Sequence, residues 1–210
     1  MSMTQESMDE FLNRLASADP TPGGGSAAAI MGAAGAALVS MVCNVSIGKK
    51  GCEAAEPELR AVLAQSETLR RRLTVMVQDD VSAFDGLMAA YKLPKATDDD
   101  KARRAEAIQA SLTRATQVPL DCARACGEVI ALSRRAGEHG YQHVISDAGV
   151  GVSAAYAALR SAALNVFINA PALKDRAFAE QAIGEIDQLL ARAASESEAV
   201  YALVRRKLAG

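Results

Sequence analysis

Several residue types that mark particular protein classes are scarce or missing in this 210-residue chain. Tryptophan is absent and aromatic residues make up 4%, so the usual platforms for stacking nucleic-acid bases are lacking. Neither sign of charge is in excess, because 23 Lys and Arg stand against 25 Asp and Glu, giving a formal net charge of −2. We therefore expect neither a nucleic acid nor an anionic membrane surface as a partner.

Cysteine and histidine are also sparse, with four and two residues. No two cysteines form a Cys-x-x-Cys pair, and the two histidines have no Cys or acidic partner at metal-ligand spacing. We expect no metal site, and we interpret the cysteines as small core residues in a reducing compartment. The residues concerned are Cys43, Cys52, Cys122, Cys126, His139 and His143.

A secretory signal is not expected, because the first twenty residues include Asp9, Glu10 and Arg14 and no continuous apolar run. Residues 26–48 carry no charge and are numerous enough to span a bilayer. However, they are mainly Ala, Gly and Ser, which partition weakly into membranes, and no aromatic belt flanks them. We predict a buried helix of a cytoplasmic protein.

Helical periodicity dominates the rest of the chain, in which alanine makes up about a fifth of the residues. No run alternates with period two, and no repeat or linker divides the sequence. We predict one all-α domain over residues 1–210, an up-and-down helical bundle with two central Ala/Gly-rich helices and long amphipathic outer helices. A kink or a restart at Pro119 is expected. The predicted helices cover residues 4–16, 26–48, 57–88, 98–117, 119–136, 148–168 and 175–208.

Both Ala-rich helices carry small residues four positions apart. Residues at this spacing share a helix face, so each helix has a row of small side chains, here called its ridge. Another backbone can approach closely along such a row. We expect the two helices to pack together or across a dimer axis, although ordinary filling of a core would give the same composition. The ridges are Ala28, Gly32, Ala36 and Ser40 in one helix, and Gly149, Ser153, Ala157, Ser161 and Asn165 in the other.

Gly23-Gly24-Gly25-Ser26 precedes the first of these helices. Glycines bring backbone N–H groups close to a ligand, and a helix N-terminus adds unpaired donors and partial positive charge. A flexible connector followed by an ordinary Ser cap would have the same sequence. The triplet is therefore a candidate binding segment, with a structural alternative.

Two carboxylates are candidate reactive groups. Asp80 lies on an apolar stripe between Val77 and Phe84, where a carboxylate must be paired or used. Asp147, with Ser146, precedes the second Ala-rich helix and is expected to cap it. A buried salt bridge is the structural alternative for Asp80, and pairing with the helix dipole is the alternative for Asp147.

Other polar residues lie on or beside the apolar helices. Lys49 and Lys50 follow the first Ala-rich helix directly, where they complement its dipole or serve a site. Asn44, Asn165 and Asn169 bond to neighbouring helices or contact the edge of a heterocyclic ligand.

Four ordered motifs together resemble the C-terminal domain of the formiminotransferase-cyclodeaminase family, which includes stand-alone bacterial methenyltetrahydrofolate cyclohydrolases. The similarity runs from about Phe11 to Leu190. The motifs are PTPGGGSAAA at 20–29 with CNVSIGKK at 43–50, DVSAF at 80–84 with YKLPK at 91–95, SDAGV at 146–150, and LNV at 164–166 with Asn169.

This resemblance implies an all-helical, dimeric enzyme that acts on folate one-carbon derivatives without a metal or cofactor. We expect hydrolysis of 5,10-methenyltetrahydrofolate to 10-formyltetrahydrofolate. The alternative is a formiminotetrahydrofolate cyclodeaminase, and a further one is a non-catalytic helical module that binds folate or oligomerises. Fused family members carry a transferase domain before this one. Here the match begins within the first dozen residues, which favours the cyclohydrolase.

The resemblance also implies roles for the candidate residues. Asp147 would stabilise the substrate cation and accept a proton from water, while Lys49 or Lys50 would steady the developing oxygen. Asp80 would carry a second proton or contact the donor edge of the pterin. Residues expected to contact substrate are Gly23, Gly24, Gly25, Ser26, Asn44, Lys50, Tyr91, Ser146, Asn165 and Asn169.

Overall fold

The computed structural model describes residues 6–209, and every regular element in that range is helical. The predicted all-α class is therefore confirmed. Three short 3-10 turns join the longer helices: η2 (Glu53–Ala55), η3 (Gln142–Val144) and η4 (Ala170–Ala172). The α-helices are α1 (Met8–Leu15), α2 (Gly24–Ser46), α3 (Glu56–Tyr91), α4 (Asp98–His139), α5 (Ile145–Asn169) and α6 (Arg176–Ala209).

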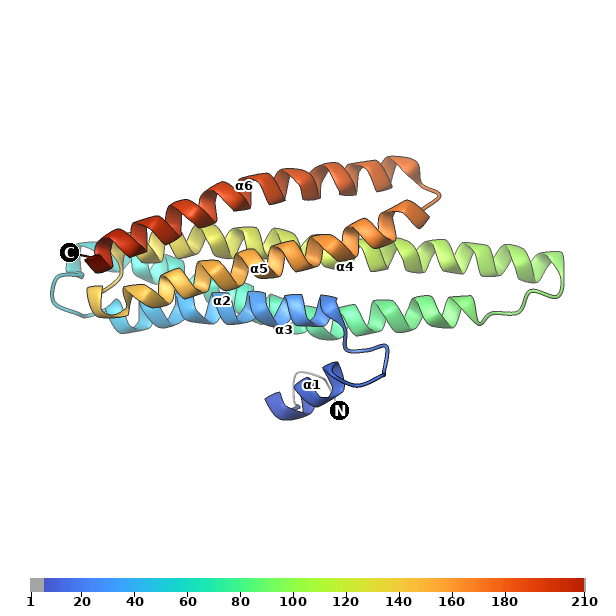
Figure 1. The fold of residues 1–210 in the computed structure, drawn as a ribbon, viewed down its shortest axis with the longest axis horizontal. Helices are drawn as coiled ribbons and strands as arrows, with labels where there is room; N and C mark the ends of the chain where they lie inside the picture. Colours follow the sequence, from blue (N-terminus) through green and yellow to red (C-terminus); the bar gives the residue numbers. More distant parts are fainter. Residues whose placement is uncertain (1–5, 210) are drawn as a thin grey trace.

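Helices α2 to α6 run alternately in opposite directions and form an elongated up-and-down bundle, with α1 standing to one side (Figure 1). The two Ala-rich helices are central, since α2 packs against α3, α4 and α5, and α5 packs against α2, α4 and α6. This arrangement confirms the predicted bundle. Its core is filled by fully buried side chains, the largest of which include Leu59, Leu73, Leu120, Ile130, Ile145, Leu159 and Ile186.

The first helix is shorter and less buried than its sequence pattern predicts. It begins at Met8 because Ser7 and Glu10 form a reciprocal capping box, each side chain bonding to the other residue's backbone N–H. Thr4, the predicted start, lies outside the described residues. Of the predicted apolar face, Phe11 is buried, whereas Met8 and Leu12 are more than half exposed.

The fourth helix is continuous through Pro119, so of the two predicted outcomes at this residue the restart as a separate helix is wrong. Proline has no N–H to donate to the carbonyl four residues earlier, here that of Ala115. Asn169, at the end of α5, supplies the missing donor: its Nδ2 lies 2.8 Å from the Ala115 oxygen. A side chain from another helix thus satisfies the carbonyl that proline leaves unpaired.

The central helices α2 and α5 approach each other most closely at a pair of glycines. A Cβ on Gly35 would lie 2.9 Å from the Gly151 oxygen, and a Cβ on Gly151 would lie 3.2 Å from the Gly35 oxygen. The backbones therefore touch at this point. Two of the predicted ridge residues have other neighbours, because Gly32 faces Cys126 and Leu73 and Gly149 faces Val204. Mutual packing of the two helices is confirmed, and its closest approach is at Gly35 and Gly151, which were not among the predicted ridge residues.

Two segments are long and apolar enough to cross a membrane by length and composition alone, Gly24–Ser46 and Gln142–Ala172. Core helices of soluble proteins meet the same criterion. In the bundle, more than half of the apolar part of the first segment is buried against other helices. Burial inside the protein therefore accounts for its apolar composition.

Candidate active site

The N-terminus of α2 lies against the carboxylate of Asp80 on α3. The Ser26 hydroxyl, which is fully buried, donates to Asp80 Oδ2 at 2.7 Å. Gly25 fits so closely beside this carboxylate that a Cβ there would lie 2.0 Å from Asp80 Oδ1. The adjoining residue Gly24 is exposed and has open space around it. The structure thus brings together three sequence-predicted residues, Gly25, Ser26 and Asp80, beside an accessible backbone segment.

Asp80 has an altered proton affinity. Burial raises the pKa of its carboxyl above the ordinary value, and hydrogen bonds from the Ser26 hydroxyl and backbone partly offset that rise. No side chain caps α2 from its own N-cap residue, Gly23, so Asp80 takes over that role from the neighbouring helix. A carboxyl with a raised pKa, next to a hydroxyl and free N–H groups, is suited to proton transfer.

The C-terminus of α2 forms a second cluster. Gly48 and Gly51 both adopt positive φ (76° and 92°), so Lys49 and Lys50 lie in a tight exposed turn. The Lys49 ammonium is 6.0 Å from the centre of the Tyr141 ring. The Tyr141 N–H donates to Ser46 Oγ at 2.7 Å, which ties this turn to the segment before α5.

Ser146 and Asp147 lie at the same end of the bundle, because α2 and α5 are antiparallel (Figure 1). Neither side chain caps α5, which begins earlier, at Ile145, with Val144 as its N-cap residue. The predicted capping role is therefore wrong. Asp147 is half-buried and makes no side-chain hydrogen bond or ion pair within residues 6–209.

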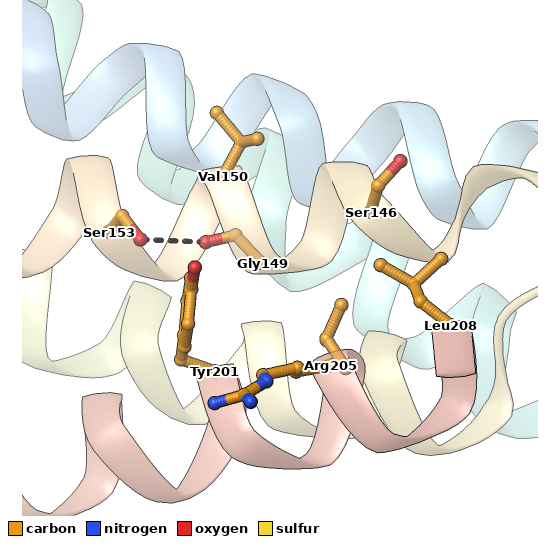
Figure 2. Close-up of a pocket in the computed structure, with 8 residues that line it drawn as sticks. Ser146, Gly149, Val150, Ser153, Tyr201, Arg205 and Leu208 are labelled. Atoms are coloured by element: carbon orange, nitrogen blue, oxygen red, sulfur yellow. Dashed lines mark hydrogen bonds between the residues drawn. The ribbon is translucent and has the colours of Figure 1, made fainter.

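A cavity of about 340 Å³ opens beside this second cluster, between α5 and the C-terminal half of α6 (Figure 2). Sequence reasoning missed its polar groups Tyr201 and Arg205, which are four residues apart on one face of α6. The four-residue spacing is the only sequence pattern that points to these two residues, and ordinary solvent-exposed helix faces have the same pattern. The lining residues are Ser146, Gly149, Val150, Ser153, Tyr201, Val204, Arg205 and Leu208.

The two clusters lie far apart within one chain. From Gly25 to the last turn of α2 the helix rises roughly 30 Å at 1.5 Å per residue. Lys49 and Asp147 are therefore at one end of α2, while Gly24 and Asp80 are at the other. These four candidate site residues therefore do not surround one cavity within a single protomer.

The remaining predicted residues have separate locations. Asn165 lies at the Gly25 end of the bundle, and its Nδ2 donates to the Ser161 oxygen at 3.1 Å. Asn169 supports the helix around Pro119, as described above. Tyr91 ends α3, well beyond Asp80, and its carbonyl accepts from Arg104 at 3.1 Å. Asn44 is exposed near the C-terminus of α2.

No group of three or more His, Cys, Asp or Glu side chains within residues 6–209 is arranged to hold a metal ion. All four cysteines are free and buried, as the sequence predicts. Burial raises the pKa of the Cys43 thiol to about 11, so this thiol is protonated near neutral pH.

Comparisons with known proteins identify the wider group to which the chain is related. The family model described as formiminotransferase-cyclodeaminase matches residues 7–188. The methenyltetrahydrofolate cyclohydrolase of Methylorubrum extorquens is 57% identical over 203 residues, which are 97% of this chain and 98% of that protein. The formimidoyltransferase-cyclodeaminase of Rattus norvegicus is 30% identical over 95% of this chain, which spans 37% of that relative.

A solved structure extends the similarity to three dimensions. The crystal structure of formiminotetrahydrofolate cyclodeaminase from Thermotoga maritima matches with a TM-score of 0.83 and 29% identity, covering 98% of this chain and 97% of that one. The sequence match and the shared fold both extend over nearly the whole chain. The chain belongs to the formiminotransferase-cyclodeaminase family.

Proposed function

We propose that the protein hydrolyses 5,10-methenyltetrahydrofolate to 10-formyltetrahydrofolate. The observation that carries this proposal is the 57% identity to a methenyltetrahydrofolate cyclohydrolase over almost the full length of both chains. Relatives named for cyclodeaminase activity are near 30% identical. The same identity favours an enzyme over the non-catalytic module that the sequence alone left open.

The reaction needs proton transfer around one carbon atom. Water adds to the carbon that bridges N5 and N10 of the substrate cation and loses one proton, giving a neutral tetrahedral carbinolamine. The remaining hydroxyl proton then leaves oxygen and a proton reaches N5 as the bond from carbon to N5 breaks. The formyl group stays on N10, and one proton is released overall. Every step is acid–base chemistry, so we propose that the enzyme uses no cofactor.

We propose that Asp80, rather than Asp147, accepts the proton from water. Asp80 lies beside the accessible backbone at the N-terminus of α2, and burial raises the pKa of its carboxyl, which makes it a better base than an ordinary carboxylate. The negative charge of the Asp80 carboxylate would also attract the positively charged substrate. Gly24, Gly25 and Ser26 would line the binding site next to it, with Asn165 at the same end of the bundle.

We also propose that the protein is a cytoplasmic homodimer. A dimer is supported by the large apolar side chains that remain exposed on the central helix α5, Val150, Leu164 and Ile168. Monomeric soluble proteins seldom leave such residues contiguous and uncovered. The substrate is a tetrahydrofolate derivative, and the reaction requires no other protein.

Spectroscopy of the purified protein tests the function. We expect it to accelerate the loss of the methenyltetrahydrofolate absorbance with release of one proton per turnover. A parallel reaction with 5-formiminotetrahydrofolate measures ammonia, which the cyclodeaminase alternative requires. Ammonia release without hydrolysis of the methenyl substrate would replace the proposed function with that alternative.

A further inference from the structure

A row of side chains runs along α3 from Asp80 to the turn before α4. Its members are four residues apart, so they are neighbours on the helix surface: Asp80, Phe84, Met88 and Lys92. The first three are half-buried, whereas Lys92 is exposed. We call these four residues the α3 row. It begins with a carboxylate, continues with two apolar side chains and ends with a cation.

The later part of the α3 row lies beyond the N-terminus of α2. The turn between α3 and α4 projects past the ends of the other helices (Figure 1). In the opposite direction the surface of α3 is covered, because α2 packs against it and Met76, one turn before Asp80, is buried. A ligand that reacts beside Asp80 therefore has room along α3 in the direction of Lys92.

The end of α3 fixes the position of Lys92. Its N–H donates to the Ala89 oxygen at 3.0 Å. The Arg104 guanidinium, from α4, donates to the Tyr91 oxygen at 3.1 Å and lies 5.9 Å from the centre of the Tyr91 ring. The Lys92 ammonium makes no ion pair within residues 6–209. This cation is therefore held at a defined place and is available to an anion.

We propose that Lys92 binds the carboxylates of the glutamate tail that a folate substrate carries, while Phe84 and Met88 contact its aminobenzoyl ring. This inference rests on the proposed function, because it places the rest of the substrate relative to the reaction at Asp80. Lys92 is thus a specificity-determining residue. It selects substrates with an anionic tail and does not touch the reacting atoms.

The length of the substrate matches the α3 row. Lys92 follows Asp80 by twelve residues, a rise of about 18 Å along the helix. Helical side chains lean toward the N-terminus and an extended lysine reaches about 6 Å, so its ammonium lies about 12 Å beyond Asp80. Summed bond lengths put the glutamate carboxylates roughly 10–12 Å from the carbon that bridges N5 and N10. The aminobenzoyl ring then lies level with Phe84 and Met88.

Charge along α3 supports the same orientation. Asp79, Asp80 and Asp85 lie near the start of the α3 row, whereas Lys92 and Lys95 lie at its end. The proposed substrate is positively charged at the bridging carbon and negatively charged at its glutamate. Its two ends therefore meet opposite charges in this orientation, while the reverse orientation would put like charges together.

Removing the charge of the glutamate tests this assignment. We compare 5,10-methenyltetrahydrofolate with its diamide, in which both glutamate carboxylates are carboxamides of the same size. The wild-type KM should be about tenfold lower for the folate, the size of one charge-assisted hydrogen bond. In Lys92→Met the KM for the folate should rise about tenfold, while the KM for the diamide and both kcat values stay the same. Lys92→Arg keeps the charge and should keep the preference for the folate.

Two further variants separate the tail from the ring and from general surface charge. Lys101→Met is the matched control, because Lys101 lies in the same hairpin but its ammonium is paired with Asp98 at 2.8 Å. It should leave the KM for both compounds unchanged. Phe84→Leu should raise the KM for both compounds by the same factor, because both carry the aminobenzoyl ring.

Three outcomes would overturn the tail site. They are a wild-type protein with the same KM for the folate and the diamide, a Lys92→Met variant that changes neither KM or both alike, and a Lys101→Met variant with the effect expected of Lys92→Met. If the wild type hydrolyses neither compound, the proposed function fails. Equilibrium dialysis of both compounds against wild type and Lys92→Met then still decides whether Lys92 binds the tail.

Discussion

Gly25 is the residue whose side chain the site can least accommodate. In Gly25→Ala the new methyl group would fall 2.0 Å from Asp80 Oδ1, so the carboxylate must move away. We expect turnover to fall at least tenfold and stability to fall by about 1–3 kcal/mol, as for other overpacked positions. Turnover assays and urea denaturation measure the two effects.

Gly184→Ala is the control for this substitution. Gly184 is exposed within α6 and has no atom within 4 Å of an added Cβ. Alanine should stabilise the helix there by about 0.5–1 kcal/mol and leave turnover unchanged. Normal turnover in Gly25→Ala would mean that the position of the Asp80 carboxylate does not matter for the reaction.

The raised pKa of Asp80 predicts a pH-dependent difference in stability. A carboxyl whose pKa is higher in the folded than in the unfolded protein is most stabilising in its protonated form. That contribution is complete below the unfolded pKa and is lost as pH rises through the folded pKa. Asp80→Asn stays neutral and keeps an oxygen for Ser26. Relative to wild type, it should therefore be more stable at pH 7 than at pH 3.5.

Thermal unfolding of both proteins across this pH range measures the difference, while turnover of Asp80→Asn should be lost at every pH. A stability difference that does not change with pH would contradict the raised pKa. The comparison separates the two roles of Asp80, since the Asn variant keeps the contact with α2 and loses only the charge.

At the level of single residues, much of this arrangement was readable from the sequence. A carboxylate on an apolar stripe must have a partner, and Ser26 is that partner. For Asn169 the sequence leaves both a bond to a neighbouring helix and a substrate contact open, because a single sequence cannot tell which backbone group a distant amide meets. Its hydrogen bond to Ala115 depends on how α4 and α5 pack.

Among the helices, α4 depends on a neighbouring helix for one of its hydrogen bonds. Asn169→Ala would leave the Ala115 carbonyl unpaired opposite Pro119, and we expect a loss of about 1–3 kcal/mol in stability. In a Pro119→Ala background residue 119 donates its own N–H, so the same substitution should cost much less. A double-mutant cycle by urea denaturation measures this coupling. Equal losses in both backgrounds would show that the Asn169 amide does not compensate for Pro119.

Helix ends were predictable where local chemistry determines them and were not where tertiary contacts do. Thr97 and Asp100 cap α4 through a local capping box that can be read directly from sequence. The passage of α4 through Pro119 and the crossing at Gly35 depend on partners far along the chain. Small residues four apart predicted that α2 packs closely with other helices, yet not which of its faces meets α5.

At the scale of the whole molecule, the candidate site was only partly predictable. The sequence motifs indicated which residues matter, and Gly25, Ser26 and Asp80 do come together. Their distance from Lys49 follows from the length of α2, which the uncharged run already indicated. No pattern in one sequence indicates how a second copy is oriented, because a self-complementary surface is a property of the folded chain.

The exposed apolar residues of α5 give the last prediction, which concerns assembly. Leu164 is 68% exposed in one protomer and lies one turn before the exposed Ile168. In Leu164→Glu a charge would be buried between two subunits, and Arg160, one turn earlier on α5, is the neighbouring cation that would offset only part of a cost of several kcal/mol. We expect the dimer to dissociate at least about 100-fold more readily, and sedimentation or light scattering at micromolar concentration measures the change.

Val75→Glu is the matched control, because Val75 is 58% exposed and lies on α3 among charged residues such as Arg71 and Asp79. It should leave the dimer intact. If Leu164→Glu also stays dimeric, the subunits meet on another surface. If it becomes a folded monomer with normal helicity, the exposed apolar surface of α5 holds the dimer together.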